Sequence, residues 1–309
     1  MAILLQLGIP DETPWRQAFA ERLPDHELRV WPDVGPAEDI EFAAVFRTPD
    51  GALARLPRLK AVFSLLAGQD ALLSDPQLPD VPILRTDTEG GSDAVTETVL
   101  MHVLRHYRRL PDYALQQARG EWRRLPHKPR AQTQVGFLGV GLLGLAAARV
   151  VAGHGFAVSG WSRTPRELDG IRHFHGADGL PALLAQSDIV VNLLPLTPET
   201  RGLLDRPVLA HLRRGAALIN VGRGEALPPR ALYWALDEGL LSSATLDVFD
   251  PEPPPPDARV WHDPRITLTP HAARSSFQVR EAVEQVALGI EALRAGRPPA
   301  HPVDRTRGY

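Results

Sequence analysis

Short apolar runs alternate with segments of helical periodicity along the whole chain, and this alternation limits the folds that are open to it. It is typical of parallel β-sheets covered by α-helices. The runs fall into two groups, so two α/β units are expected, and a length of 309 residues also favours two domains. The predicted strands are residues 3–7, 26–31, 42–46, 59–66 and 82–84 in the first group, and 135–138, 157–161, 189–194, 216–221, 244–248 and 266–268 in the second.

Helices are predicted between these strands and at the end of each group. Val95, Val99 and Val103 recur with the 3.6-residue period of a helix, in a segment long enough to connect two domains. Val283 and Val286 mark one face of a final helix, which is expected to pack against the first unit. The predicted helices are residues 14–23, 51–56, 93–119, 142–152, 180–186, 229–238 and 275–295.

The composition is that of a folded protein, and it excludes several kinds of site. The chain is 44% apolar and 23% charged, and its formal net charge of −3 offers no broad attraction for nucleic acid or an anionic membrane. It has no cysteine, which excludes disulfides, thiolate nucleophiles and cysteine-ligated metals. No run reaches the ~18 apolar residues of a transmembrane helix. Residues 2–7 are typical of a first strand and not of a signal peptide, so a cytoplasmic protein is expected.

Three glycines, Gly139, Gly141 and Gly144, directly follow a short apolar strand and open an alanine-rich helix. A dinucleotide site requires this context, because it needs a tight turn, close approach of the backbone to a pyrophosphate, and close packing of helix on strand. The first amides of the helix, at Leu142 and Leu143, would meet the phosphates with the positive end of the helix dipole. The alternative is a glycine-rich turn that binds no ligand.

The end of the next predicted strand indicates which dinucleotide is bound. A site for NAD normally has an acidic residue there, which accepts hydrogen bonds from the ribose. Here the chain has Ser162, Arg163 and Thr164, and no acid before Glu167. Two hydroxyls and a guanidinium suit a 2′-phosphate, which a carboxylate would repel, so NADPH is the preferred cofactor and NADH the second choice. The alternative is that Arg163 is a solvated turn residue.

Three ionisable residues, Arg223, Glu252 and His271, each follow a predicted strand of the second group. Ligands of open α/β sheets bind at the carboxyl ends of the strands, so these side chains are candidates for one site. A guanidinium can hold a carboxylate through two hydrogen bonds, and a histidine braced by a carboxylate can carry the proton that carbonyl reduction consumes. The alternatives are an arginine that caps a surface turn, an acid in a proline-rich loop, and one histidine among 11.

Other histidines are interpreted as solvated. His102 and His106 lie four residues apart on the predicted connecting helix, but no glutamate of an HExxH motif lies between them and no third metal ligand is evident. We interpret both as members of a solvent-exposed helix face, and we interpret His173 and His175 as solvated too. The basic stretch 123–128 is interpreted as a solvated linker in an acidic protein. No metal site and no nucleic-acid or membrane partner is predicted.

Several motifs, in the same order along the chain, resemble those of the D-isomer-specific 2-hydroxyacid dehydrogenase family. Besides the glycine fingerprint and the arginine, glutamate and histidine segments, they are residues 65–72 (LLAGQDAL), 161–164 (WSRT), 192–200 (NLLPLTPET) and 303–309 (VDRTRGY). The resemblance implies two Rossmann-like or flavodoxin-like domains with parallel sheets. The substrate domain would be discontinuous, with residues 1–98 and 274–309, and the dinucleotide-binding domain, residues 99–273, would be inserted in it.

The resemblance also implies roles for single residues of the inserted domain. Arg223 would bind a 2-oxo acid, His271 would be the acid or base, and Glu252 would pair with His271. Asp247 would contact the carboxamide of the nicotinamide. The further cofactor contacts that the resemblance implies are Leu194, Pro195, Leu196, Val221 and Gly222.

The substrate contacts implied for the other domain lie in two segments. Backbone amides around Leu66, Ala67 and Gly68 would hold the substrate carboxylate. Phe46 stands where similar reductases have a tryptophan beside the substrate, so the side chain that the site accepts is expected to differ. Similar enzymes form homodimers mainly through their nucleotide domains.

Together these features predict an NADPH-dependent reductase that converts a small 2-oxo acid, such as glyoxylate or hydroxypyruvate, into the D-2-hydroxy acid. Two alternatives stay open. One is a cofactor-sensing binding protein of the corepressor type, which the absence of extended disordered arms disfavours. The other is a reductase of bulkier 2-oxo acids.

Overall fold

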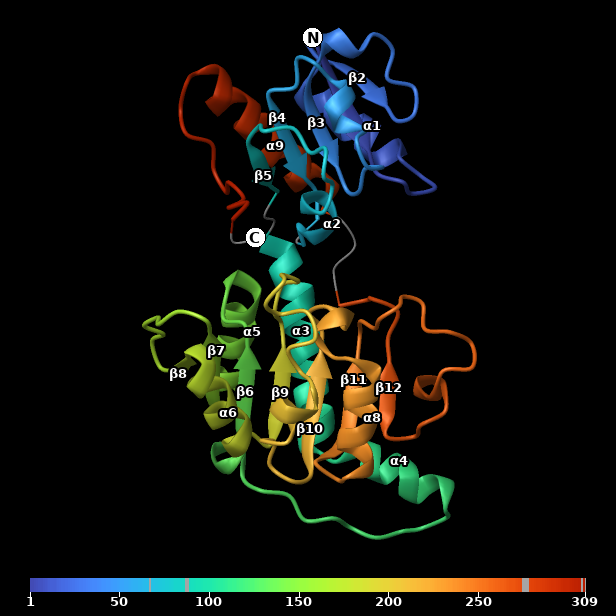
Figure 1. Ribbon diagram of the computed structural model, residues 1–309, viewed down its shortest axis with the longest axis vertical. Coiled ribbons are helices and arrows are strands. Elements are labelled where there is room, and N and C mark those ends of the chain that lie inside the picture. Colours follow the sequence, from blue (N-terminus) through green and yellow to red (C-terminus); the bar gives the residue numbers. More distant parts are fainter. Residues whose placement is uncertain (67, 87–88, 274–277, 307, 309) are drawn as a thin grey trace. The chain divides into compact units, whose positions relative to one another are not determined.

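The computed structural model describes residues 1–66, 68–86, 89–273, 278–306 and 308, with the backbone alone for residues 89–92. The chain forms two compact units (Figure 1). The first consists of Met1–Gly91 and Ser276–Tyr309, so both ends of the chain belong to it, and the second is Ser92–Ser275. Each unit contains one parallel sheet, which confirms the predicted fold class.

The first unit has a five-stranded parallel sheet in the order β2-β1-β3-β4-β5. This is the strand order of flavodoxin-like proteins. All of its strands overlap with predicted ones. The strands are β1 (Ala2–Gln6), β2 (Glu27–Val30), β3 (Ile40–Val45), β4 (Ala61–Ser64) and β5 (Ile83–Arg85), and the helices are α1 (Thr13–Arg22), α2 (Asp70–Leu73) and α9 (Val279–Arg294).

Helices cover both faces of the first sheet. α1 and α9 pack on the face that carries Ile3 and Phe63, whereas α2 packs on the opposite face through Leu72. Gly289 lets α9 lie close to the sheet, because a Cβ there would be 2.4 Å from the ring of Phe63. The expected packing of the final helix on the first unit is therefore confirmed, although the start predicted for it, within 274–277, lies outside the described residues.

The second unit has a seven-stranded parallel sheet in the order β12-β11-β10-β9-β6-β7-β8. Counted from β6, this is the order of a doubly wound nucleotide-binding sheet with one further strand, and the direction of winding changes between β6 and β9. The strands are β6 (Gln134–Leu138), β7 (Ala157–Ser162), β8 (Arg172–His175), β9 (Ile189–Asn192), β10 (Ala216–Asn220), β11 (Leu241–Leu246) and β12 (Ile266–Leu268), and the helices are α3 (Glu89–Tyr107), α4 (Leu110–Ala118), α5 (Leu142–Gly153), α6 (Gly176–Gln186), α7 (Arg206–Leu209) and α8 (Pro229–Asp237).

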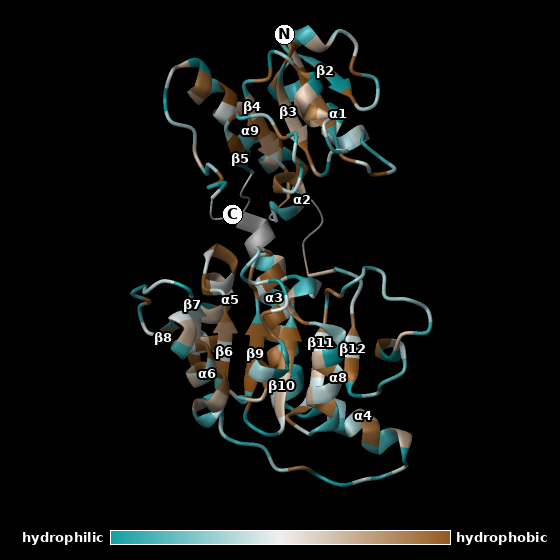
Figure 2. Ribbon diagram, viewed as in Figure 1, coloured by the Kyte–Doolittle hydropathy of each residue, from teal (hydrophilic) through white to brown (hydrophobic). Residues whose placement is uncertain are grey.

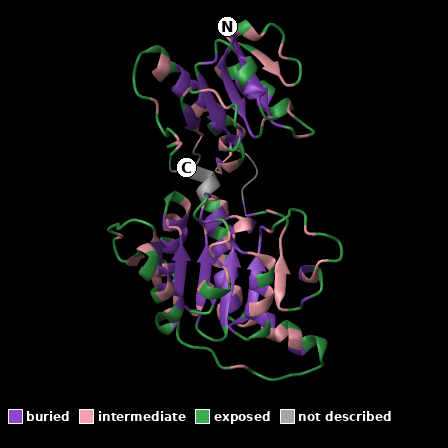
Figure 3. Cartoon of the chain, in the orientation of Figure 1, coloured by how far each residue is buried: buried purple, intermediate pink, exposed green. Residues whose placement is uncertain are grey.

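The core of the second unit has two layers, one on each face of the sheet. α3 and α5 cover the face that carries Phe137 and Ile219, and α6 and α8 cover the face that carries Val190 and Leu218. The central strands are apolar, as Figure 2 shows, and buried, as Figure 3 shows. Because both faces are covered, these strands are continuous apolar runs in the sequence and were predictable from it.

Two predictions of local structure were wrong, and one strand was missed. β8 was not predicted, because its sequence is polar and, as an edge strand, it pairs with β7 alone. The connecting helix 93–119 is two helices, α3 and α4, separated where Arg109 has a φ of 60°. Pro111 explains this break, because it has no N–H to donate to the carbonyl four residues earlier. The helix predicted at 51–56 is only a 3₁₀ turn, Leu53–Arg55.

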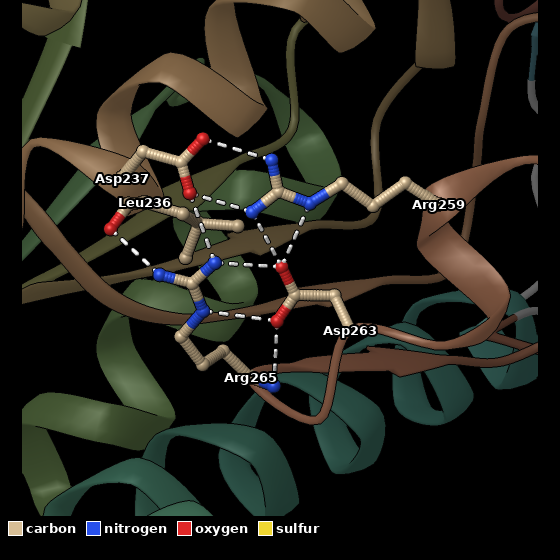
Figure 4. A network of polar contacts seen from close by, with 5 residues as sticks. All are labelled: Leu236, Asp237, Arg259, Asp263 and Arg265. Carbon is tan, nitrogen blue, oxygen red and sulfur yellow. Dashed lines mark hydrogen bonds and ion pairs between the residues drawn. The ribbon is translucent and has the colours of Figure 1, made fainter.

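A polar network joins the segment before β12 to the end of α8 (Figure 4). The guanidinium groups of Arg259 and Arg265 both contact the carboxylates of Asp237 and Asp263. Arg265 also donates a hydrogen bond to the carbonyl of Leu236 at 2.8 Å. The Asp263 side chain is almost fully buried, whereas that of Asp237 is half exposed. Since β12 is a three-residue edge strand, this network helps to hold it against β11.

Asp263→Asn is expected to lower the free energy of unfolding by about 2 kcal/mol at pH 7. Hydrogen bonds from Arg265 lower the pKa of Asp263 to about 2 in the folded protein, from an ordinary value of 3.8. Because the folded pKa is the lower one, this stability is present above about pH 4 and is lost as the pH falls towards 2.

Denaturant unfolding at pH 7 and at pH 3 would measure the difference between the wild type and Asp263→Asn. The difference should shrink at pH 3, and a difference that stays constant would contradict the assignment. Asp237→Asn is the matched control, and it should cost less because the Asp237 carboxylate is half exposed.

Candidate active site

The predicted site residues of the second unit lie at the carboxyl edge of its parallel sheet. Neighbouring parallel strands end at the same edge, so residues that follow them come together although they are far apart in the sequence. Across the sheet they are Ser162, Arg163 and Thr164 at the end of β7, Gly139, Gly141 and Gly144 after β6, Leu194, Pro195 and Leu196 after β9, Val221, Gly222 and Arg223 after β10, Asp247 and Glu252 after β11, and His271 after β12.

The glycine turn between β6 and α5 leaves open space for a ligand. Gly139 has a φ of 90°, and a Cβ on Gly144 would lie 1.9 Å from the carbonyl oxygen of Gly139, so both positions require glycine. A Cβ on Gly141 would meet nothing within 4 Å. Gly141 is the N-cap of α5, so the amides of Leu142 and Leu143 have no partner within the helix. This open helix N-terminus fits the pyrophosphate of a dinucleotide.

Two buried asparagines, whose role was not predicted, shape the turns after β9 and β10. Nδ2 of Asn192 donates to Oδ1 of Asn220 at 2.9 Å. The amides of Leu194 and Gly222 donate to the Oδ1 atoms of Asn192 and Asn220, at 3.3 and 3.2 Å. Nδ2 of Asn220 donates to the carbonyl of Arg223 at 3.2 Å. The pair therefore fixes the backbone that carries Arg223, and its signal in the sequence was a polar residue closing each of two neighbouring apolar strands.

The segment predicted to bind a 2′-phosphate carries an accessible cation. Ser162 is half-buried, and Arg163 and Thr164 are exposed. Nη1 of Arg163 lies 3.4 Å from Oε2 of Glu199, which also accepts a hydrogen bond from the hydroxyl of Thr197 at 2.7 Å. Both ends of this ion pair are largely solvated, so it contributes little stability and leaves the guanidinium able to contact a phosphate.

His271 and Glu252 form a hydrogen-bonded pair. Nδ1 of His271 lies 3.0 Å from Oε2 of Glu252, and Oε1 of the same carboxylate accepts from the amide of Phe249 at 3.1 Å. An ionised carboxylate can only accept, so Nδ1 carries the hydrogen and Nε2 is the ring nitrogen left to exchange a proton. The side chains are 40% and 39% exposed, so neither is sealed from solvent.

Asp247 holds the loop that carries His271. Its buried carboxylate accepts hydrogen bonds from Oγ1 of Thr269 at 2.5 Å and from the amides of Ala272 and Ala273 at 2.8 and 2.9 Å. The amide of His271 donates to the carbonyl of Asp247 at 2.8 Å. His271 has a φ of 53°, a conformation that costs a non-glycine residue on the order of 1 kcal/mol. These hydrogen bonds keep His271 in that conformation.

The loops after β10 and β11 pack directly against each other. A Cβ on Gly224 would lie 2.1 Å from the backbone of Phe249, so this approach requires glycine. Arg223 directly precedes Gly224, and the amide of Phe249 is bonded to Glu252, the partner of His271. The structure therefore brings the segments of the three predicted catalytic residues together through a continuous series of contacts.

The predicted substrate-binding residues of the first unit lie at the carboxyl edge of its own sheet. Phe46 follows β3 and is buried, with its ring perpendicular to that of Trp15 at a centroid distance of 5.5 Å. Leu66 and Gly68 follow β4 and are half-buried, and Ala67 lies outside the described residues. A role of these residues in substrate binding stays a prediction.

The interpretation of His102 and His106 as solvated residues is wrong, because both are buried. The ring nitrogens of His106 lie 3.1 Å from Oγ of Ser243 and 2.9 Å from Oγ1 of Thr245, both on β11, and burial lowers its pKa to about 3. A neutral imidazole therefore joins α3 to the sheet.

In the described ranges of the chain, no three histidine, aspartate or glutamate side chains form a cluster that could hold a metal. No described helix is long and apolar enough to cross a membrane.

Known proteins resemble the chain over almost its whole length. Residues 100–273 match the family model described as D-isomer specific 2-hydroxyacid dehydrogenase, NAD binding domain. Glyoxylate/hydroxypyruvate reductase A of Serratia proteamaculans (strain 568) is 41% identical over 301 residues, which cover 96% of each chain. The protein of the same name from Yersinia enterocolitica is 38% identical, also over 96% of each chain.

Solved structures are similar in fold as well. One is a D-isomer specific 2-hydroxyacid dehydrogenase from Xanthobacter autotrophicus Py2, in complex with NADPH and MES. Its TM-score is 0.95 and its sequence identity is 41%, and the match covers 100% of this chain and 99% of that chain. An NADPH-dependent glyoxylate/hydroxypyruvate reductase from Sinorhizobium meliloti, in complex with NADP and sulfate, has a TM-score of 0.90 and 36% identity, with 100% of both chains covered. The chain therefore belongs to the D-isomer-specific 2-hydroxyacid dehydrogenase family.

Proposed function

We propose that the protein is an NADPH-dependent reductase that converts small 2-oxo acids, such as glyoxylate and hydroxypyruvate, into D-2-hydroxy acids. The observation that carries the proposal is the hydrogen bond from Nδ1 of His271 to Glu252, at the same sheet edge as Arg223 and the glycine turn. A nucleotide turn, a cation and a carboxylate-braced imidazole are the parts that reduction of a 2-oxo acid needs. The names of the relatives support this choice of substrates and of NADPH.

His271 would supply the proton of the reaction. Reduction of a carbonyl adds a hydride to carbon and a proton to oxygen, and Nε2 of His271 would donate that proton. Glu252 would keep the ring in one orientation through Nδ1. The hydrogen bond from the amide of Phe249 would in turn fix the direction of the carboxylate.

Arg223 would bind the substrate carboxylate and stabilise negative charge on the reacting oxygen. A bound nicotinamide would supply the hydride. The cofactor's pyrophosphate would be held at the glycine turn and the first amides of α5, and its 2′-phosphate by residues 162–164. Residues 194–196 and 221–222, whose turns the asparagine pair shapes, would line the remainder of the cofactor site.

A panel of 2-oxo acids tests this function. Steady-state rates would be measured on glyoxylate, hydroxypyruvate, phenylpyruvate and 2-oxoisocaproate, each with NADPH and NADH, and the product would be analysed for chirality. We expect the highest kcat/KM for a small acid with NADPH, and the D-product from hydroxypyruvate.

Binding of NADPH without turnover of any acid would indicate a cofactor-sensing protein. A higher kcat/KM for phenylpyruvate would indicate a reductase of bulkier acids, and equal values with NADH would contradict the NADPH preference.

Asp247→Asn is expected to lower kcat about tenfold and the free energy of unfolding by about 2 kcal/mol. The amides of Ala272 and Ala273 donate to different oxygens of the carboxylate, so the NH2 group of asparagine would face one of them and at least one hydrogen bond to the His271 loop would be lost. Thr269→Val, which removes a single bond to the same carboxylate, is the matched control with a smaller effect. Rate assays and denaturant unfolding measure both effects, and an unchanged kcat in Asp247→Asn would contradict the positioning role.

We also propose that the enzyme is a homodimer formed through the second unit and that it acts in the cytoplasm. Large apolar side chains are exposed on α3, on α4 and in the segment that follows, at Met101, Leu110 and Trp122. These side chains lie on consecutive elements of the second unit, and contact with another protein surface would bury them. Sedimentation equilibrium should give twice the chain mass for the wild type and a shift towards the monomer for Trp122→Ser. A monomeric wild type would contradict the proposal.

A further inference from the structure

The interpretation of His173 and His175 as solvated residues holds for His175, which is exposed, and is incomplete for His173, which is half-buried with both ring nitrogens hydrogen-bonded. His173 lies on β8, the edge strand that pairs with β7. Its Nε2 lies 2.8 Å from Oγ of Ser162, and the amide of Arg166 donates to its Nδ1 at 3.3 Å. Its neighbour His175 is exposed and stacks on it at a centroid distance of 5.9 Å. One imidazole therefore holds both ends of the segment 162–166.

These hydrogen bonds require a neutral imidazole with its hydrogen on Nε2. Oγ of Ser162 donates to the carbonyl of Thr164 at 2.8 Å, so it must accept from Nε2 of His173. Nδ1 accepts from a backbone amide, so it carries a lone pair. Burial, with His175 and Arg166 nearby, lowers the pKa of His173, which keeps the ring neutral at pH 7. The segment 162–166 thus has one hydrogen-bonded shape.

Arg166 extends from this segment to the glycine turn. Its Nη1 donates to the carbonyl of Val140, between Gly139 and Gly141, at 3.1 Å. Within the described parts of the chain, no carboxylate lies within ion-pairing distance of Arg166, whereas Arg163 lies 3.4 Å from Glu199. A guanidinium has five N–H donors, and a single carbonyl uses one of them here, so Arg166 retains donors and its full charge for an anion.

We propose that His173 is a positioning residue that shapes segment 162–166 to bind the 2′-phosphate of NADPH, and that Arg166 is a second cation for that phosphate, beside Arg163. This inference rests on the proposed function, and it deepens it by assigning the cofactor preference to two further residues. Arg163 and Arg166 would contact the phosphate, and His173 would act through Ser162, whose hydroxyl hydrogen bonds the carbonyl of Thr164, and through the backbone of Arg166. Two guanidinium groups would bind one phosphate strongly and would select the nucleotide that carries it, because each can make paired, charge-assisted hydrogen bonds.

Binding measurements without turnover test this assignment. Adenosine 2′,5′-bisphosphate and adenosine 5′-monophosphate differ only in the 2′-phosphate, so their dissociation constants, measured by titration calorimetry, isolate its contribution. The wild type should bind the bisphosphate more tightly. His173→Ala and Arg166→Gln should each weaken binding of the bisphosphate about tenfold and binding of the monophosphate less than about twofold. The ratio of KM for NADPH to KM for NADH should rise by a similar factor.

Two further variants serve as a partial rescue and a control. His173→Gln can place an amide N–H near the position of Nε2, to donate to Ser162, but it cannot also place its oxygen at the position of Nδ1, so it should weaken bisphosphate binding only about threefold. His175→Gln, on the same face of β8, removes the stacking but neither hydrogen bond, and should leave the preference unchanged. If His173→Ala does not fold, His173→Gln and Arg166→Gln still decide the outcome.

The possible results separate this inference from the function on which it rests. A wild type that binds the two nucleotides equally well would overturn the proposed NADPH preference. A wild-type preference that survives in His173→Ala and Arg166→Gln would overturn the present inference alone. Equal weakening of both nucleotides would also overturn it, because a merely structural role of His173 produces that result.

Discussion

His271→Gln is expected to lower kcat for reduction of a 2-oxo acid about a thousandfold while the dissociation constant for NADPH changes less than about twofold. Glutamine can still donate a hydrogen bond to Glu252, so the loop that Asp247 holds should keep its conformation. An amide cannot release a proton to a developing alkoxide at neutral pH, and the proton would have to come from water. Stopped-flow measurement of NADPH oxidation in a single turnover isolates this step from product release.

Glu252→Gln is the matched control for the His271 prediction. It keeps a single side-chain oxygen, which can accept from the amide of Phe249 or from Nδ1 of His271 but not from both, and it removes the negative charge beside the ring. We expect a loss in kcat of about tenfold to a hundredfold, between the wild type and His271→Gln, because the imidazole that donates the proton is still present but is held less firmly in its orientation. A loss of less than tenfold in His271→Gln would contradict the assignment of His271 as the proton donor.

Arg223→Ala is expected to lower kcat/KM for glyoxylate about a thousandfold. The guanidinium is proposed to make two charge-assisted hydrogen bonds to the substrate, and the loss of both corresponds to about 4 kcal/mol. Part of the effect should appear in KM, through the carboxylate, and part in kcat, through charge on the reacting oxygen. Arg223→Lys should recover only a fraction of the activity, because an ammonium cannot make the paired contact.

Chemical rescue distinguishes this role from a structural one. The Arg223 guanidinium also donates to the carbonyl of Gly222 at 2.9 Å, so its removal will affect the turn as well. Added guanidinium ion should restore part of the activity of Arg223→Ala, and it should have no such effect on His271→Gln. Absence of rescue together with a loss below tenfold would contradict the assignment of Arg223.

The two sheets were predictable because their central strands are buried on both faces. Such strands are short continuous apolar runs, and helices separate them in the sequence, as at β6 and α5. β8 lacked this signal, since its sequence is Arg172-His173-Phe174-His175 and it has a neighbour on one side only. The break between α3 and α4 did have a signal, Pro111, which the apolar periodicity of the surrounding helix obscured.

The buried histidines of α3 show the limit of residue type as a guide to environment. Histidine is common both at surfaces and in cores, so a solvated interpretation of His106 was reasonable from local sequence. Its partners, Ser243 and Thr245, lie more than 130 residues away on β11. Only the packing of α3 on the sheet shows that these hydroxyls are available to it.

The sequence by itself determined which chemical groups stand at the carboxyl ends of the strands, including the glycine turn, Arg223 and His271. Strand, turn and helix signals act over a few neighbouring residues, so local sequence encodes them. Only the tertiary structure decided which groups hold those residues in place, such as Asp247 on the His271 loop and His173 on the segment that carries Arg163. These hydrogen bonds join residues that are 7 and 11 positions apart for His173 and 22 to 26 positions apart for Asp247. They exist because particular strands lie side by side, which no local pattern specifies.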